Sequence, residues 1–66
     1  MTIKTLLKKI KINCPVRIIR NGEEICDSTN ISQENADVLD QIVLEIDCET
    51  RYGHDDYYTG LIIHVL

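Results

Sequence analysis

The sequence predicts a small α+β domain over residues 1–66, an antiparallel sheet of three to four strands with one N-terminal helix packed on one face. Three observations carry this prediction. Apolar residues recur with helical spacing near the N-terminus, an Asn-Gly pair separates two strand-like runs, and residues 40–66 hold two further strand-like runs around a polar loop. The length fits a single domain near the lower limit for a self-sufficient core.

The first predicted element is a helix of about nine to eleven residues that starts after Thr2. Its apolar residues at positions 3, 6, 7 and 10 form one stripe, and lysines occupy its last turn, where they favour the negative end of the helix dipole. Asn13 can end the helix in a left-handed conformation, and Pro15 prevents its continuation. A helix this short is unstable alone, so its stripe must pack on a sheet.

Residues 16–20 and 23–27 are predicted to form a hairpin around Asn21-Gly22, the strongest short-range hairpin signal in the chain. A two-residue turn places Ile18 opposite Ile25, and we expect both side chains in the core. The same register places a valine opposite Asp27, which is a poor match. The pairing is therefore expected to end or bulge at that position.

Residues 28–35 are polar without alternation and are predicted to form a loop, with one or two helical turns over residues 33–39. Residues 40–46 fit either a helix or a strand, and we favour a strand with Ile42, Leu44 and Ile46 half-buried. A second strand runs from Tyr57 to Leu66. It is almost continuously apolar from Leu61 on, which is typical of a central strand covered on both faces.

The second face of this sheet has no predicted cover. Ile19, Val43 and Ile62 would form an apolar patch there. The chain contains no Phe and no Trp, so its core is small and aliphatic. A homodimer that buries this face is one arrangement that would remove the patch and add stability.

Charge is distributed unequally along the chain. Residues 1–20 carry six of the seven Lys and Arg residues and no acid, whereas residues 21–66 carry Arg51 and all eleven acids, for a net charge of −4. This asymmetry indicates either neutralisation within the fold or a surface for a basic partner. With no signal-peptide core, no membrane-spanning run and only three cysteines, we expect a cytoplasmic protein.

Aromatic and charged residues are concentrated between positions 45 and 58. Tyrosine rings and a planar guanidinium are typical of protein interfaces. On one strand face, Glu45, Asp47 and Glu49 would lie about 7 Å apart, close to the phosphate repeat of a nucleic-acid strand. The alternative is a solvated strand face with either Tyr57 or Tyr58 in the core. The predicted partner-binding residues are Glu45, Asp47, Glu49, Arg51, Tyr52, Asp55, Asp56, Tyr57 and Tyr58.

No catalytic residue, metal ligand or cofactor is predicted. His54, Asp55 and Asp56 are the residues that a small metal-dependent nuclease would use, but a polar turn has the same composition. The three cysteines lack the C-x₂-C spacing of zinc sites and fit separate buried thiols. His64 is expected to lie at a strand end without binding a metal.

The segments TIKTLLKKI and PVRIIRNGEEI and the later VLEI run resemble the layout of many small proteins of bacterial phages and mobile elements. Some short, acidic proteins of that group are anti-CRISPR or other anti-defence proteins. The resemblance implies a non-enzymatic, phage-derived protein of the bacterial host cell that inhibits or modulates a basic partner, for example a defence nuclease.

Two other functions stay open. One is a nucleic-acid-binding module that uses Lys4, Lys8 and Lys11 with Arg17, although direct binding of this kind is opposed by the net charge of −4. The other is the metal-dependent nuclease.

Overall fold

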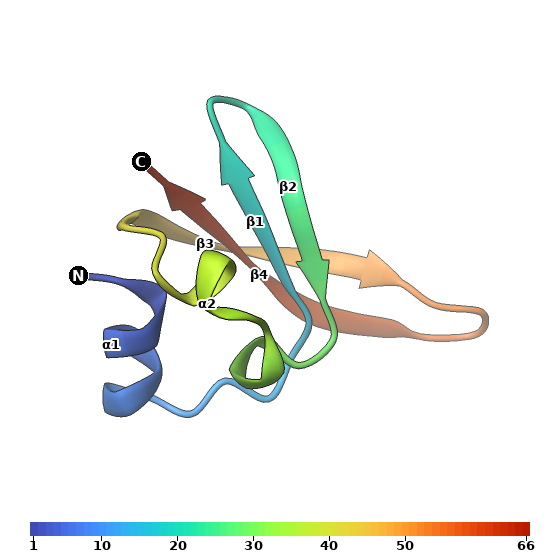
Figure 1. Ribbon diagram of the computed structural model, residues 1–66. Coiled ribbons are helices and arrows are strands. Elements are labelled where there is room, and N and C mark those ends of the chain that lie inside the picture. Colours follow the sequence, from blue (N-terminus) through green and yellow to red (C-terminus); the bar gives the residue numbers. More distant parts are fainter.

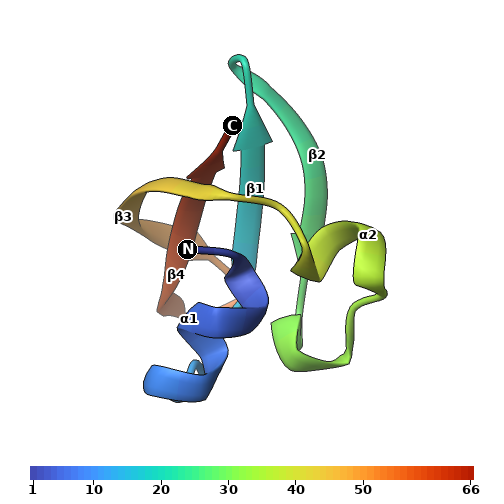
Figure 2. The ribbon, with the colours of Figure 1, turned by 60° about the vertical axis from the view of Figure 1, so that its left-hand side comes forward.

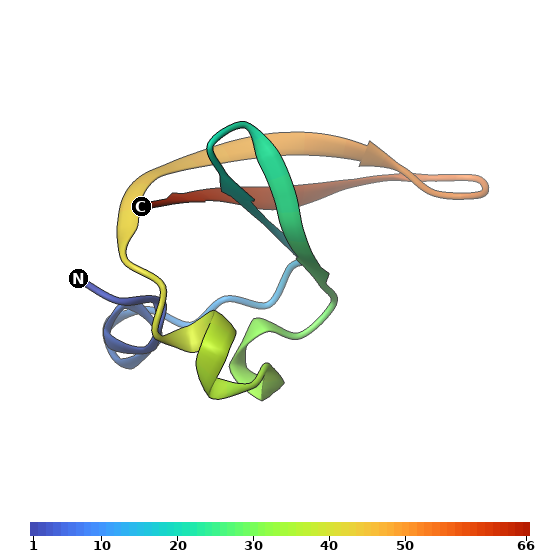
Figure 3. The ribbon, with the colours of Figure 1, turned by 45° about the horizontal axis from the view of Figure 1, so that its top comes forward.

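The computed structural model describes residues 1–66 and consists of a four-stranded sheet with its helical segments gathered on one face (Figures 1 and 3). The strands are ordered β2-β1-β4-β3, so β1 and β4 are central and β2 and β3 are edges. The elements in chain order are α1 (Ile3–Lys9), β1 (Val16–Arg20), β2 (Glu23–Ser28), the 3₁₀ helix η1 (Ile31–Gln33), α2 (Ala36–Leu39), β3 (Val43–Tyr52) and β4 (Tyr57–Val65).

The α+β class and the four strands are confirmed, but the prediction of a purely antiparallel sheet is wrong. Both hairpins are antiparallel, whereas β1 and β4 run parallel to each other, with Ile18 beside Ile63. A turn sequence fixes pairing within a hairpin but not how two hairpins join. Here they join through their most apolar strands, so that β1 and β4 lie side by side (Figure 2). The buried residues of both strands belong to the core cluster.

Helix α1 is shorter than predicted. Thr2 caps it as expected, because its hydroxyl oxygen accepts the amide hydrogen of Thr5 at 3.1 Å. Ile3 and Leu6 are buried, but the helix ends at Lys9 and Ile10 is extended and exposed. The residue before the Thr2 cap is also tied to the sheet, since Val43 of β3 donates its amide hydrogen to the carbonyl of Met1 at 2.8 Å.

The β1–β2 hairpin confirms the predicted turn and corrects its register. Asn21 and Gly22 both have positive φ angles (53° and 80°), as a type I′ turn requires. A bulge follows, so that Ile18 pairs with Cys26 instead of Ile25. Ile25 is 39% exposed, and the prediction that it lies in the core is wrong. The extra residue of a bulge moves every later side chain of that strand to the other face.

The segment between the two hairpins, which contains η1 and α2, covers part of the core. Helix α2 lies within the predicted residues 33–39, and a strand follows at Val43. Ile31, which the sequence places in a loop, is only 1% exposed and belongs to the core cluster. That cluster consists of Ile3, Leu6, Val16, Ile18, Ile31, Ile63 and Val65.

Strand β3 is an edge strand, and this position explains a further correction. Ile42, Leu44 and Ile46 were expected to be half-buried, but all three are exposed. The core cluster takes its sheet residues from β1 and β4, and none from β3. Strand β4 is central as predicted. Ile19, Val43 and Ile62, the residues of the predicted apolar patch, are each half-buried, and Val43 packs against the core.

Candidate functional site

The β3–β4 hairpin projects beyond the body of the molecule (Figures 1 and 3). Strand β1 pairs only with residues 61–65 of β4, whereas β3 pairs with β4 from Val43–Val65 out to Tyr52–Tyr57. The outer half of the hairpin is therefore a two-stranded ribbon. The predicted binding residues between positions 49 and 58 all lie on this ribbon or its loop.

The three tyrosines gather at the outer end of the ribbon, and none is buried. Tyr52 is 75% exposed, Tyr57 71% and Tyr58 43%. Tyr52 and Tyr57 face each other across the strands with ring centroids 5.1 Å apart in an edge-to-face arrangement. This contact fixes the two rings in a favourable geometry while leaving them open to solvent. The alternative of one tyrosine in the core is therefore wrong.

The loop at the tip is a compact turn. Gly53 donates its amide hydrogen to the carbonyl of Asp56 at 2.8 Å, and the Asp56 carboxylate accepts the amide hydrogen of Tyr57 at 2.9 Å. Asp55 and Asp56 form no ion pair and are exposed. His54, Asp55 and Asp56 line one shallow depression of about 200 Å³, but they do not bring three ligand atoms together.

An ion-pair network lies across the second face of the sheet and holds two of the predicted binding residues. Arg51 on β3 donates to Glu49 at 2.7 Å through Nε and to Asp27 on β2 at 2.8 Å through Nη2. Arg51 and Glu49 have side chains only 13% and 15% exposed. The hydrogen bond to Asp27, ahead of the bond to Glu49, raises the pKa of Arg51 above its usual value, while its partial burial opposes the shift.

Arg17 completes this network from β1. Its Nη2 lies 3.4 Å from Glu49, and its Nε lies 2.8 Å from Glu24. The contact between Arg17 Nε and Glu24 meets the distance of an ion pair but not the geometry of a hydrogen bond. The buried Nε atom therefore has no hydrogen-bond partner. Arg51 crosses the sheet above Gly60, where a Cβ atom would lie 3.0 Å from the Arg51 Nε. Glu49 and Arg51 therefore stabilise the base of the ribbon, and most of their side-chain surface is buried.

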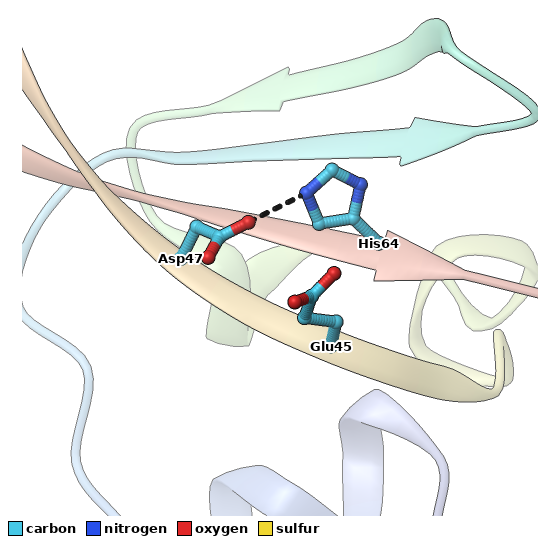
Figure 4. A group of neighbouring side chains, drawn as sticks. All are labelled: Glu45, Asp47 and His64. Atoms are coloured by element: carbon cyan, nitrogen blue, oxygen red, sulfur yellow. Dashed lines mark hydrogen bonds and ion pairs between the residues drawn. The ribbon is translucent and has the colours of Figure 1, made fainter.

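Glu45 and Asp47 have a different arrangement from the predicted row of acids. A bulge between Val43 and Glu45 places Glu45 directly opposite His64 on β4. His64 Nε2 lies 2.9 Å from an oxygen of Asp47, and ligand atoms of Glu45, Asp47 and His64 all lie within 4.8 Å of one another (Figure 4). The two carboxylates thus converge on an imidazole and do not reproduce a phosphate spacing.

The N-terminal lysines do not neutralise these acids. Lys4, Lys8, Lys9 and Lys11 are exposed and form no ion pair. Three of them line a groove of about 460 Å³ beside the end of α1, together with Asn30 and Ser32. The four lysines therefore keep their charge unpaired in the folded chain, whereas Arg17 pairs with Glu24 and Glu49 and neutralises part of the asymmetry.

The three cysteines are free thiols in different surroundings. Cys14 and Cys26 are half-buried, whereas Cys48 on β3 is exposed, so the prediction of three buried thiols is wrong for Cys48. The Cys26 Sγ lies 3.7 Å from a carboxylate oxygen of Glu34. Burial, followed by the negative charge of Glu34, raises the pKa of Cys26.

These surroundings predict the order of cysteine alkylation. At mildly alkaline pH we expect iodoacetamide to modify Cys48 before Cys26, because a raised pKa lowers the thiolate fraction and burial restricts access. Mass spectrometry of timed digests gives the two rates. A Glu34→Gln variant is expected to accelerate modification of Cys26 only. Faster modification of Cys26 than of Cys48 in the unchanged chain would contradict this environment.

Sequence reasoning found the exposed tyrosines and acids but missed His64 and the anchoring role of Arg51. Both depend on register and on contacts between strands far apart in the sequence.

Neither α1 nor α2 has the length and hydrophobicity needed to cross a membrane. Comparisons with protein-family models, curated proteins and solved structures gave no match.

Proposed function

We propose that this chain is a non-enzymatic binding protein that engages a basic protein partner through the tip of its β3–β4 hairpin. The contact residues are Tyr52, Asp55, Asp56, Tyr57 and Tyr58, with Glu45 and Asp47 as a second acidic pair nearer the start of β3. One observation carries the proposal: three exposed tyrosines and two unpaired acids share the end of a projecting ribbon.

The composition of the tip supports binding over a structural role. Tyr52 and Tyr57 contribute nothing to the buried core, yet they hold large apolar area in water at fixed positions. Tyrosine is enriched at the centres of interfaces because its ring buries much surface with little loss of conformational entropy. The edge-to-face contact reduces the ordering needed on binding.

The charge at the tip supports a basic partner. Asp55 and Asp56 have no ion-pair partner in the chain. Unpaired acids accelerate association with a positively charged surface and disfavour acidic partners. A nucleic-acid-binding effector, such as a defence nuclease of a bacterial host, presents a surface of that kind. The free cysteines fit action in the reducing cytoplasm.

Affinity capture with matched variants tests this proposal. The immobilised full chain is exposed to a bacterial lysate at low salt, and bound proteins are eluted with rising salt and identified by mass spectrometry. We expect a basic partner that a Tyr52→Ser/Tyr57→Ser variant binds roughly tenfold more weakly or not at all, because exposed anchors of this type dominate interface energy. Asp55→Asn/Asp56→Asn is expected to weaken binding and reduce its salt dependence.

The control for this experiment is a Lys4→Gln/Lys8→Gln variant, which changes exposed residues of α1 and leaves the hairpin intact. It should retain the partner fully. A partner retained equally by the tyrosine variant and the unchanged chain would overturn the proposal.

The lysine groove supports a second candidate function, direct binding of nucleic acid. Lys8, Lys9 and Lys11 line this groove and form no ion pair within the chain. Their charges are therefore available to neutralise phosphate groups. The net charge of −4 opposes it. Filter binding of DNA and RNA at low salt separates the two candidates. Retention that Lys8→Gln/Lys11→Gln abolishes would favour the groove over the hairpin tip.

A further inference from the structure

Glu45, Asp47 and His64 form a cluster that the proposed function explains only in part, since it gives no role to His64. The three side chains come from adjacent strands and point toward one another on the face opposite the helices (Figure 4). One ligand atom from each lies within 4.8 Å of the other two. This is the only group of three or more His, Cys, Asp or Glu residues in the chain with ligand atoms so close.

The backbone holds these residues in register. Glu45 is paired directly with His64, and Asp47 follows two residues later on the same face of β3. The part of β4 that carries His64 is paired on its other side with β1. The ligands therefore stand where the hairpin is part of the four-stranded sheet, with His64 on a central strand and both acids on the edge strand, and not on the loop at the tip.

We infer that this cluster is a binding site for a divalent transition-metal cation. One imidazole nitrogen and two carboxylates are a donor set suited to a borderline cation such as Zn²⁺ or Co²⁺. Two carboxylates with a neutral imidazole supply two negative charges, which balance the charge of the cation. The cation takes the place of the hydrogen between His64 Nε2 and Asp47, and water completes its coordination because the site is open to solvent.

The other residues of the chain that could bind a metal do not form a comparable site. The three cysteines are soft ligands but lie apart from one another, and the residues of the tip loop do not converge. A cation in the sheet site would neutralise the two acids that the proposed function adds to the contact residues of the tip. Metal binding itself does not depend on that interface, so the two proposals fail separately.

Titration with Co²⁺ tests the inference directly. In a ¹⁵N-labelled full chain, we expect saturable paramagnetic shifts and broadening centred on residues 45–47 and 62–65. The visible spectrum should lack the intense charge-transfer bands of cobalt thiolates. The isosteric variants Glu45→Gln and Asp47→Asn and the variant His64→Gln are each expected to weaken Co²⁺ binding by at least roughly 10-fold, since even indirect ligand partners have effects of this size.

The matched control is His54→Gln, which removes the other histidine of the chain and should leave Co²⁺ affinity unchanged. The dispersed ¹⁵N spectrum of each variant shows whether it folds, and the substituted carboxylates are exposed and unnecessary for the core. Broadening centred on residues 54–56 or on a cysteine, unchanged affinity in the His64 variant, or no saturable binding would overturn the inference.

Discussion

Replacing Ile31 with alanine is expected to lower the free energy of unfolding by about 2–5 kcal/mol. Ile31 is 1% exposed and packs in the single core cluster, so its truncation leaves a cavity between η1 and the sheet. A domain of this length has roughly 3 to 10 kcal/mol of total stability. The substitution is therefore expected to remove from about a fifth of this stability to all of it.

Ile25→Ala is the matched control for this prediction, because the sequence pattern assigned the two isoleucines the opposite roles. Ile25 lies at the bulge of β2 and is 39% exposed, so its truncation should change the free energy of unfolding by less than about 1 kcal/mol. Urea denaturation followed by circular dichroism measures both changes. A larger loss from Ile25→Ala than from Ile31→Ala would mean that β2 pairs without the bulge.

Replacing Arg51 with methionine is expected to cost about 1–3 kcal/mol. Methionine keeps most of the side-chain length above Gly60 but removes the hydrogen bonds to Glu49 and Asp27. Glu49 is 15% exposed and would keep only its longer contact with Arg17. Because the Asp27 side chain is 42% exposed, water replaces part of its lost interaction, which places the cost below that of a fully buried pair.

Arg20→Met is the control for Arg51→Met, because it removes one positive charge without disturbing the ion-pair network around Arg51. Arg20 is exposed and makes one long hydrogen bond, 3.4 Å from Nη1 to the side chain of Gln41. Its replacement should change stability by less than about 0.5 kcal/mol. Guanidinium chloride would screen both charges, so urea is the appropriate denaturant. Equal losses in the two variants would show that the network around Arg51 contributes nothing specific.

Local signals predicted the parts of the fold that depend on neighbouring residues. The Thr2 cap, the Asn21-Gly22 turn and the apolar strand β4 all formed as expected. The two bulges were not predictable in position, because an extra residue is decided by packing across strands and not by the strand's own pattern. The parallel contact between β1 and β4 has the same origin.

The candidate site divides in the same way. The tyrosines and the acids of the tip are exposed because they surround a turn at the end of a long hairpin. The sequence indicates this turn but leaves open whether Tyr57 or Tyr58 enters the core. The burial of Glu49 in an ion-pair network depends on Arg51, which reaches across the sheet to Asp27. The cluster around His64 depends on the register between β3 and β4. The residue pattern of a single segment reveals neither the contact between β3 and β2 nor the register between β3 and β4.

The most direct measurement of the proposed function maps the surface that the partner covers. Chemical shifts of the ¹⁵N-labelled chain are recorded before and after addition of the captured partner. We expect the largest changes in residues 52–58, with smaller changes near Glu45 and Asp47. Changes confined to the lysine groove at residues 7–13, with the hairpin tip unaffected, would contradict binding through the projecting hairpin.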